Sequence, residues 1–254
     1  VTNMKEMFTY STAFDQDLDT WDTSNVENMQ EMFWEASAFD GNLSGWDLSG
    51  LTGSQPARNM FDTASEFTGV GVENWNVSNV TDMRRMFRRA ASFNADISSW
   101  DVSSVTNMQE MFTSASSFDQ DLGGWNVSNV NDMLRMFDGA TLSTPNYDSL
   151  LTGWASQTPN LQNNVQFHGG NSQYSSVALN ARNNTLIGIH NWTITDGGMV
   201  AIAQTYCNDS DGDGHGDPNV NVTATSPPDS SWVLACDDCD DSVFACNLDC
   251  TLLN

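Results

Sequence analysis

The chain has 254 residues, of which 33 are acidic and 8 are basic, so its formal net charge is −25. Such acidity argues against nucleic acid and anionic membranes as partners, because both repel a negatively charged surface. The sequence holds no apolar run long enough to cross a membrane and shows no signal peptide at Val1, so we expect no membrane insertion of this chain.

A tryptophan recurs at nearly constant steps along the first 154 residues. The ladder has steps of 25 or 29 residues and consists of Trp21, Trp46, Trp75, Trp100, Trp125 and Trp154. Four of the segments that follow a tryptophan read DTSNVENMQEMF, NVSNVTDMRRMF, DVSSVTNMQEMF and NVSNVNDMLRMF, whereas the copy after Trp46 is irregular and includes Pro56. Self-similarity at a fixed period indicates a repeat array, in which each copy covers the apolar face of the next.

Each copy contains an apolar stripe with helical spacing. In the copy between Trp100 and Trp125 the stripe follows i, i+3, i+4, i+7 and consists of Met108, Met111, Phe112 and Ala115. Thr106 and Gln109 have the form of a capping box before it, and the later half of the copy is turn-rich. We therefore predict one short strand and one short helix per copy. Stacked copies then bury tryptophan, methionine, phenylalanine and leucine in a continuous core, which is not a cofactor site.

Four of the eight basic residues fall within one stretch, DMRRMFRRA. They are Arg84, Arg85, Arg88 and Arg89, on the predicted helix face opposite Met83, Met86 and Phe87. This pattern has two interpretations. One is a solvated helix face, and the other is a docking patch for an acidic partner such as the acidic tail of another copy.

Residues 141–198 keep some of the spacing but lose the methionine–phenylalanine stripe. We predict a helix at YDSLLTGW, a strand and turn at NVQFHGG, a helix at SSVALNARNNTLI and a final strand at NWTIT. Because the end of a repeat array needs a cover with one polar face, this segment is expected to be the cap.

Residues 199–254 contain an acidic loop, CNDSDGDGHGDP. Alternating carboxylates on a glycine-rich loop are typical of a calcium site, with positions 1, 3, 5, 7 and 9 filled by Asp209, Asp211, Asp213, the carbonyl of His215, and Asp217. Val220 stands where an EF-hand has glutamate, so further oxygens must come from elsewhere. The expected source is CDDCDD, which supplies Asp237, Asp238, Asp240 and Asp241. The alternative is a solvated acidic linker.

All five cysteines lie in the same segment: Cys207, Cys236, Cys239, Cys246 and Cys250. Their clustering indicates disulfides and therefore an oxidising, extracellular environment. The odd number leaves one thiol free, or paired with another chain or a further segment. The Cys-x-x-Cys spacing of Cys236 and Cys239 also allows zinc or redox chemistry, although no helix or βαβ pattern accompanies it.

The repeats, with WDVSSVTNMQEMF and FDQDL, resemble those of BspA-type bacterial leucine-rich-repeat surface proteins, which also occur in mycoplasma lipoprotein-associated proteins. The resemblance covers residues 1–198, including YDSLLTGW and WTITDGG. It implies an α+β leucine-rich-repeat-like, right-handed solenoid on a bacterial surface, with a role in attachment or in protein or glycan binding.

The acidic segment resembles thrombospondin type-three-like calcium repeats. This second resemblance implies that Asp209, Asp211, Asp213 and Asp217 are ligands and that Asp240 and Asp241 complete the shell.

The sequence thus predicts three parts: a solenoid over 1–140, its cap over 141–198 and a calcium-binding segment over 199–254. We find no H-E-x-x-H, G-x-S-x-G or Walker motif and expect no enzymatic activity. The expected function is adhesion or recognition by a secreted or cell-surface protein, and the alternative is a subunit of a calcium-dependent extracellular fibre. Because the chain opens within a copy, at VTNMKEMF, we also expect a processed product or fragment with copies upstream.

Overall fold

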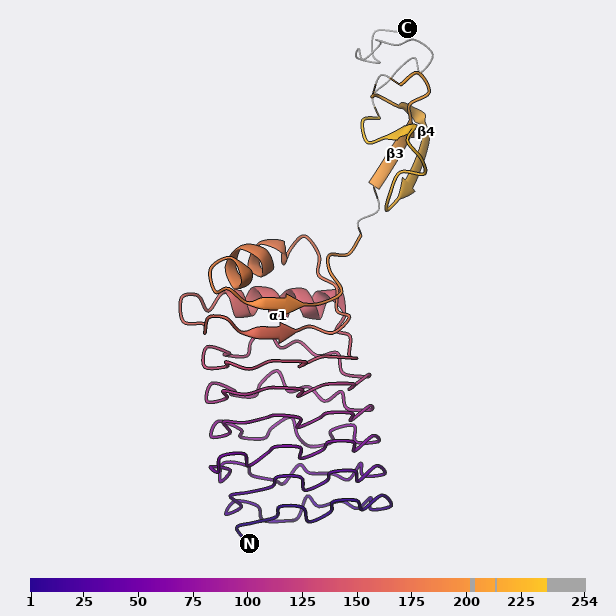
Figure 1. The fold of residues 1–254 in the computed structure, drawn as a ribbon. Coiled ribbons are helices and arrows are strands. Elements are labelled where there is room, and N and C mark those ends of the chain that lie inside the picture. Colours follow the sequence, from indigo (N-terminus) through magenta and orange to yellow (C-terminus); the bar gives the residue numbers. More distant parts are fainter. Residues whose placement is uncertain (202–203, 213, 237–254) are drawn as a thin grey trace. The chain divides into compact units, whose positions relative to one another are not determined.

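The computed structural model describes residues 1–201, 204–212 and 214–236, and the chain forms two compact units, Val1–Met199 and Val200–Asn254 (Figure 1). The first unit contains α1 (Thr144–Ala155), β1 (Gln166–His168), the π-helix η1 (Ala181–Ile187) and β2 (Thr193–Thr195). The second contains β3 (Gln204–Asn208), β4 (Asp217–Ala224) and β5 (Trp232–Val233), in the sheet order β4-β3-β5. In the part of the chain that is described, neither α1 nor η1 combines the length and the apolar character that a membrane span needs.

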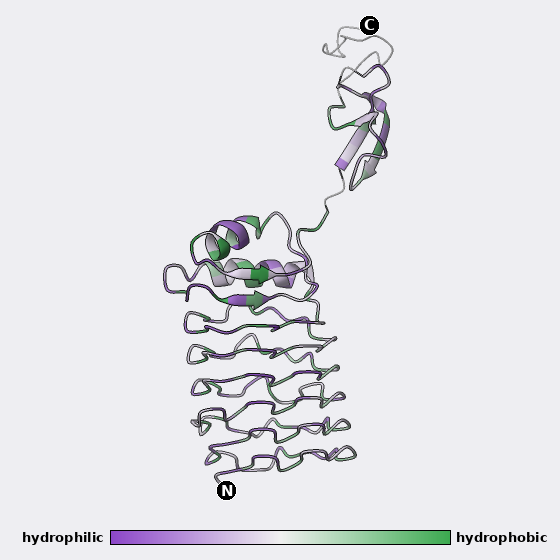
Figure 2. Cartoon of the chain, viewed as in Figure 1, coloured by the Kyte–Doolittle hydropathy of each residue, from purple (hydrophilic) through white to green (hydrophobic). Residues whose placement is uncertain are grey.

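The repeat copies lie one above another, and each folds into a flat turn that we call a coil (Figure 1). Backbone hydrogen bonds join neighbouring coils in register. The amides of Met83, Arg85 and Phe87 donate to the carbonyls of Asn107, Gln109 and Met111 at 2.9–3.0 Å. Figure 2 shows hydrophobic and hydrophilic residues alternating along each coil. This alternation sends one set of side chains inward and leaves the other outside.

The predicted short helix of each copy is wrong. Residues 1–143, all of which are described, contain turns and isolated bridges such as Asn107↔Asp132, and no helix or extended strand. Within 108–115 the amides alternate in direction. Those of 108, 110, 112 and 114 donate to the next coil, and those of 111, 113 and 115 donate to the carbonyl three residues back.

The need to bond with neighbouring coils explains this departure from a helix. A helix directs every amide to a carbonyl four residues back along its own axis, so it would leave the adjacent coil without donors. The alternation requires left-handed backbone at Glu110 (φ 56°) and Ser114 (φ 58°), and Arg85 and Arg89 have the same conformation one coil earlier. Each such residue costs about 1–3 kcal/mol. The inter-coil hydrogen bonds and the buried core offset that cost.

The predicted burial of the apolar stripe is confirmed. Met108, Met111, Phe112 and Ala115 are all fully buried. The phenylalanine rings of successive coils stack, with ring centroids 5.8 Å apart for Phe87–Phe112 and 5.3 Å apart for Phe112–Phe137. Side-chain spacing therefore predicted which residues lie inside, although the backbone that carries them is not helical.

The tryptophans link each coil to the one before it. Trp75, Trp100 and Trp125 are buried, and the indole N–H of Trp100 donates to the carbonyl of Val72 at 3.0 Å. The same bond recurs from Trp46, Trp75, Trp125 and Trp154. Trp21, in the first coil, is only partly buried. A buried indole needs an acceptor, and the preceding coil supplies it.

The predicted capping box is also wrong, because the side chain that accepts the backbone amide of Gln109 is that of Asn107 and not that of Thr106. The Asn107 side chain accepts the amide of Gln109 at 2.9 Å, whereas Thr106 donates to Thr81 of the preceding coil. A similar side-chain turn follows the tryptophans, for example from Asp101 to Ser103. Much of the asparagine and aspartate in the repeats therefore shapes tight turns.

The irregular third copy keeps its place in the stack. The amide of Met29 donates to the carbonyl of Pro56 at 2.8 Å, and that of Phe33 donates to Met60 at 2.8 Å. The extra residues, including Thr52 and Ser54, lie exposed on the surface. The insertion is therefore a loop on the outside of the coil.

The predicted elements of residues 141–198 are present as α1, β1, η1 and β2. β1 and β2 pair in parallel, with Phe167 opposite Ile194, and β1 continues the ladder because the amide of Phe137 donates to the carbonyl of His168 at 3.0 Å. A buried ion pair holds this region together. Asp196 receives two hydrogen bonds from Arg182 and one from the hydroxyl of Tyr147 at 2.8 Å. The last strand is thereby fixed to both helices.

Candidate functional site

The acidic loop of the second unit folds around Asp209. One carboxylate oxygen of Asp209 accepts the amide of Gly212 at 2.7 Å and the other accepts that of Gly214 at 3.0 Å. Both glycines have positive φ, 80° and 95°, a conformation that glycine adopts at little cost. The glycine spacing of the sequence therefore serves to curl the loop back onto its first carboxylate.

The other predicted calcium ligands are only partly within the described residues. Asp217 begins β4, and its side chain accepts the backbone amide of Asn219 at 2.7 Å. Asp211 and His215 lie in the same loop, between Asp209 and Asp217. The remaining predicted ligands lie outside the described residues: Asp213, Asp237, Asp238, Asp240 and Asp241.

The described part of the chain contains no group of three or more His, Cys, Asp or Glu side chains arranged to hold a metal ion. The donor chemistry nevertheless suits Ca²⁺, which prefers several carboxylate and carbonyl oxygens on one flexible loop. Each Asp209 oxygen accepts one amide, and a carboxylate oxygen can accept more than one partner. The predicted ligands that fall among the described residues are Asp209, Asp211 and Asp217, with the carbonyl of His215.

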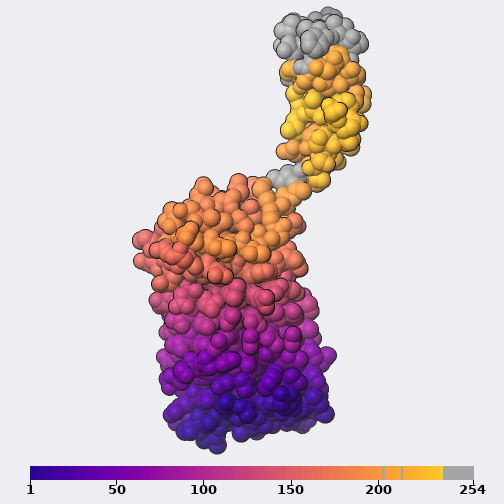
Figure 3. Space-filling model, viewed as in Figure 1, coloured from indigo at the N-terminus to yellow at the C-terminus, as the bar shows by residue number. Residues whose placement is uncertain are grey.

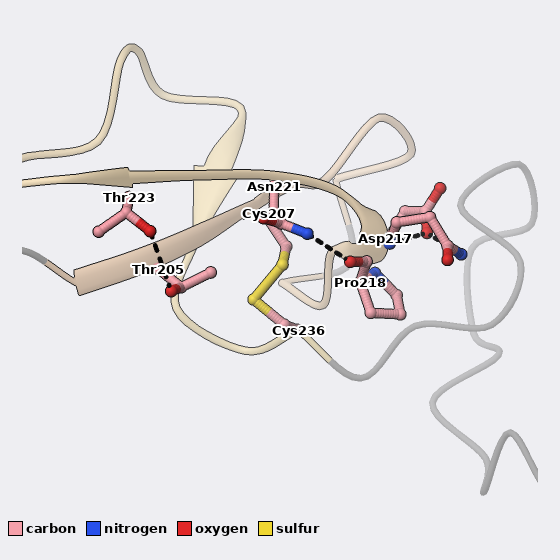
Figure 4. Close-up of a disulfide and its surroundings, with 8 residues drawn as sticks. Thr205, Cys207, Asp217, Pro218, Asn221, Thr223 and Cys236 are labelled. Atoms are coloured by element: carbon pink, nitrogen blue, oxygen red, sulfur yellow. Dashed lines mark hydrogen bonds between the residues drawn. A yellow bond between two sulfur atoms is a disulfide. The ribbon is translucent and has the colours of Figure 1, made fainter.

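A disulfide joins two of the five candidate cysteines, Cys207 of β3 and Cys236 (Figure 4). Their Cα atoms are 5.3 Å apart and 29 residues apart in sequence. Closing a loop of that length stabilises a fold by about 3–4 kcal/mol in the chain-entropy account. In this pairing the sulfur of Cys236 is bonded to Cys207 and is not a thiolate ligand. Cys239, Cys246 and Cys250 lie outside the described residues.

The four clustered arginines lie on the outside of one coil, away from the buried Met83, Met86 and Phe87. Arg85 donates two hydrogen bonds, of 2.9 and 3.0 Å, to the carboxylate of Glu110 in the next coil. Arg88 bridges Glu110, at 3.2 Å, and Asp62 of the preceding coil, at 3.1 Å. This chain of charges therefore ties three successive coils together.

The two acids of this network respond in opposite directions to their surroundings. Hydrogen bonding from Arg85 lowers the pKa of Glu110, so this pair contributes stability near neutral pH. Burial raises the pKa of Asp62, and the charge of Arg88 only partly offsets that effect. Arg84 reaches Asp82 at 3.7 Å, and Arg89 is exposed and forms no ion pair with any described residue.

Two polar clusters were not predicted from sequence. Arg182 and Asp196 form the buried pair of the cap, and their signal was present, because Asp196 is the sole acidic residue between Asp148 and Asp209. The second cluster joins His190 to the hydroxyl of Thr158 at 2.8 Å and to Asn163 at 3.1 Å. His190 is only 3% exposed, and both ring nitrogens are bonded. The cluster therefore fastens the loop after α1 and is not an accessible catalytic centre.

The larger of two surface grooves has no acidic or basic side chain in its lining. It has a volume of about 420 Å³ and is lined by glycine, serine and amide side chains, among them Gly124, Ser156 and Asn160. A smaller groove of about 300 Å³ is lined by Asn131, Asp132, Leu134, Asn164 and Gln166. On the face in view in Figure 3, the coils form a continuous surface.

The family model described as "Mycoplasma protein of unknown function, DUF285" matches residues 1–67 and 55–174, which span the repeats and part of the cap. No curated protein matches the chain, and no solved structure matches it.

Proposed function

The chain belongs to the family described as Mycoplasma protein of unknown function, DUF285, and we propose that it is an extracellular, non-enzymatic protein that binds a protein or a glycan through the outside of its coils. We propose further that the coils form a right-handed solenoid of the BspA leucine-rich-repeat type. In this proposal Ca²⁺ stabilises the second unit.

The strongest support is the division of the coils into a closed inside and an open outside. The repeated apolar positions are buried, the tryptophan N–H groups find carbonyl partners in the preceding coil, and alternate amides bond to the next coil. The stack therefore satisfies its own core. What remains for a partner is a long, polar surface that repeats with every coil, as expected of solenoid binding proteins.

The Cys207–Cys236 disulfide supports an extracellular location. Disulfides persist in oxidising compartments and are rare in the cytosol. The near absence of lysine, and the lack of any basic residue after Arg182, agree with a tail whose charge partner is a cation from the medium.

The alternative proposal is that copies of the chain join into a calcium-dependent extracellular fibre.

The calcium proposal is tested by calorimetric titration of the full chain. We expect Ca²⁺ binding that is abolished by the double substitution Asp209→Asn/Asp211→Asn. Each substitution replaces a charged carboxylate, which a hard cation prefers, with a neutral amide that offers a single oxygen. The matched control is Asp229→Asn. It removes a charge in the same unit, at an exposed turn whose hydrogen bonds to Ser231 asparagine can keep. No heat of binding in the wild type would refute the proposal.

Sedimentation of the same samples separates the two functions. A monomer with and without Ca²⁺, together with a specific ligand on a glycan or protein array, supports recognition. Polymers that form only with Ca²⁺ support the fibre instead. A monomer with no ligand on either array contradicts the recognition proposal.

A further inference from the structure

The larger surface groove lies where α1 ends against the neighbouring coil, and we call it the α1 groove. One wall is the coil segment from Gly123 to Ser128, and the other runs from Gly153, in the last turn of α1, to Asn160. Its volume of about 420 Å³ lies within the range of about 300–1,000 Å³ that is usual for small-molecule sites. The groove is therefore large enough to hold a ligand of that size.

The side chain of Gln157 holds the two walls together. Its Nε2 donates to the carbonyl of Trp125 at 2.8 Å, and its Oε1 accepts the amide of Val127 at 2.9 Å. The indole of Trp154, in α1, adds a second link, because it donates to the carbonyl of Leu122 at 3.0 Å. The walls are thus fixed before a ligand arrives, which reduces the entropic cost of binding.

Gly124 keeps the groove open, and packing does not explain its missing side chain. A Cβ on Gly123 would clash with the carbonyl of Ser149, and one on Gly153 would clash with the carbonyl of Gly123, so these two glycines let α1 approach the coil. A Cβ on Gly124 would meet no atom of the described residues within 4 Å, and Gly124 does not have a positive φ. Other copies have a side chain at this position: Thr20, Asn74 and Ser99.

Several polar groups of the groove have no hydrogen-bond partner among the described residues. They are the side chain of Asn160, the hydroxyl of Ser128 and the backbone amide of Gly124. The Asn126 side chain uses its oxygen, which accepts the amide of Ser128 at 3.1 Å, and its two N–H donors are open. Gly124, Asn126 and Asn160 are exposed. The groove therefore offers donors and acceptors side by side.

The chemistry of the lining excludes most classes of ligand. All eight lining residues are described, and they are glycine, serine, asparagine and glutamine. A hard cation would lack carboxylates. An anion would lack a basic partner and would face the partial negative charge at the C-terminal end of α1. An apolar ligand would leave the polar groups covered and unpaired. A neutral ligand rich in hydroxyl groups satisfies the lining.

We propose that the α1 groove binds a neutral saccharide, with one sugar ring over Gly124 and its hydroxyls bonded to Asn126, Ser128 and Asn160. Each sugar hydroxyl both donates and accepts, as the amides and hydroxyls of the groove do. A polypeptide partner would instead need a desolvated aromatic or aliphatic centre, which the lining lacks. This inference rests on the proposed recognition function and assigns it a site and a ligand class.

Affinity electrophoresis of the full chain in EDTA tests the inference. The neutral probes are dextran, mannan, galactan, arabinoxylan and glycol chitin, and the comparison probes are polygalacturonate, which is anionic, and gelatin, which is a polypeptide. We expect at least one neutral polysaccharide to retard the wild type, and neither comparison probe to do so.

The variant Gly124→Leu should lose at least about tenfold in affinity for that polysaccharide, because the leucine side chain fills the place of the sugar ring. Asn160→Ala removes an exposed side chain and should lose about twofold to tenfold, as expected for one hydrogen bond. It also keeps the inference testable if Gly124→Leu folds poorly. Unchanged tryptophan emission, which reports the buried Trp125 and Trp154, shows that each variant is folded.

The matched control is Asn74→Leu. It places the same side chain at the same repeat position two copies earlier, where Asn74 is exposed and lies outside the lining of the groove. We expect its affinity to stay at the wild-type value.

Five outcomes overturn the inference: no retardation by any neutral polysaccharide, wild-type affinity in folded Gly124→Leu and Asn160→Ala, an equal loss in Asn74→Leu, retardation by gelatin that Gly124→Leu abolishes, or binding only when Ca²⁺ is added. If a ligand from the array experiment binds Gly124→Leu as tightly as the wild type, the proposed function stands and this inference fails. If neither array gives a ligand, both fail.

Discussion

Replacing Phe112 by alanine is expected to lower the free energy of unfolding by about 3–5 kcal/mol. The ring is fully buried and contacts rings of its own copy and of both neighbours. Its centroid is 4.1 Å from that of Phe118, 5.8 Å from Phe87 and 5.3 Å from Phe137. Removing it therefore leaves a cavity that three coils share, and none of them can collapse to fill it alone.

Phe8 provides the matched control, because it holds the same repeat position in the first coil, where it is only partly buried. Phe8→Ala should cost clearly less than Phe112→Ala. Urea unfolding followed by circular dichroism and tryptophan fluorescence measures both. An equal cost at the two positions would mean that burial between copies is not what stabilises the stack.

The substitution Asp196→Asn is expected to lower the free energy of unfolding by about 3–5 kcal/mol, because it leaves the largely covered charge of Arg182 without its partner. The Asp196 carboxylate is 1% exposed and meets Arg182 at 2.8 Å. It also accepts the hydroxyl of Tyr147 and the amide of Gly198. An amide in its place is neutral and has one acceptor oxygen, so the charge of Arg182, whose side chain is 14% exposed, is left without its partner.

Tyr147→Phe is the control, because it removes one neutral donor from the same carboxylate. Burial and the charge of Asp196 raise the pKa of Tyr147 well above its usual value, so the hydroxyl is uncharged. Removing this one hydrogen bond to a carboxylate should lower the free energy of unfolding by about 1.5–3 kcal/mol. Hydrogen exchange should show the loss of protection from Asp196→Asn centred on residues 161–199. Wild-type protection there in Asp196→Asn would contradict a structural role for the pair.

Spacing along the chain predicted the core but not the backbone. Met108, Met111 and Phe112 are buried because a stripe with that period faces inward in either a helix or this turn structure. The period alone does not tell where each amide is directed. Only the neighbouring coil, through its carbonyls at residues 132–138, selects the alternating conformation over the helix.

The polar residues were harder to interpret for a related reason. A single copy does not show that Asn107 closes a turn or that Arg85 pairs with Glu110, which is 25 residues ahead. Aligning the copies one above another would have placed opposite charges at equivalent positions and suggested the pair. In the acidic loop the glycines let the backbone curl back onto Asp209, which accepts the amides of Gly212 and Gly214. Several of the expected calcium ligands lie outside the described residues, so the calcium site stays a prediction.

The most direct test of the account removes one whole copy, residues 101–125, so that Trp100 is followed by Asn126. If copies stack as equivalent coils, Asn126 takes the place of Asp101 and the shortened chain stays folded, with buried tryptophans and a single cooperative unfolding transition. Removing only residues 113–125 breaks the register and should unfold the stack. Circular dichroism and tryptophan fluorescence of the two deletions decide the matter. Equal unfolding of both would contradict the repeat architecture, and a folded whole-copy deletion beside an unfolded partial one is the result that the account predicts.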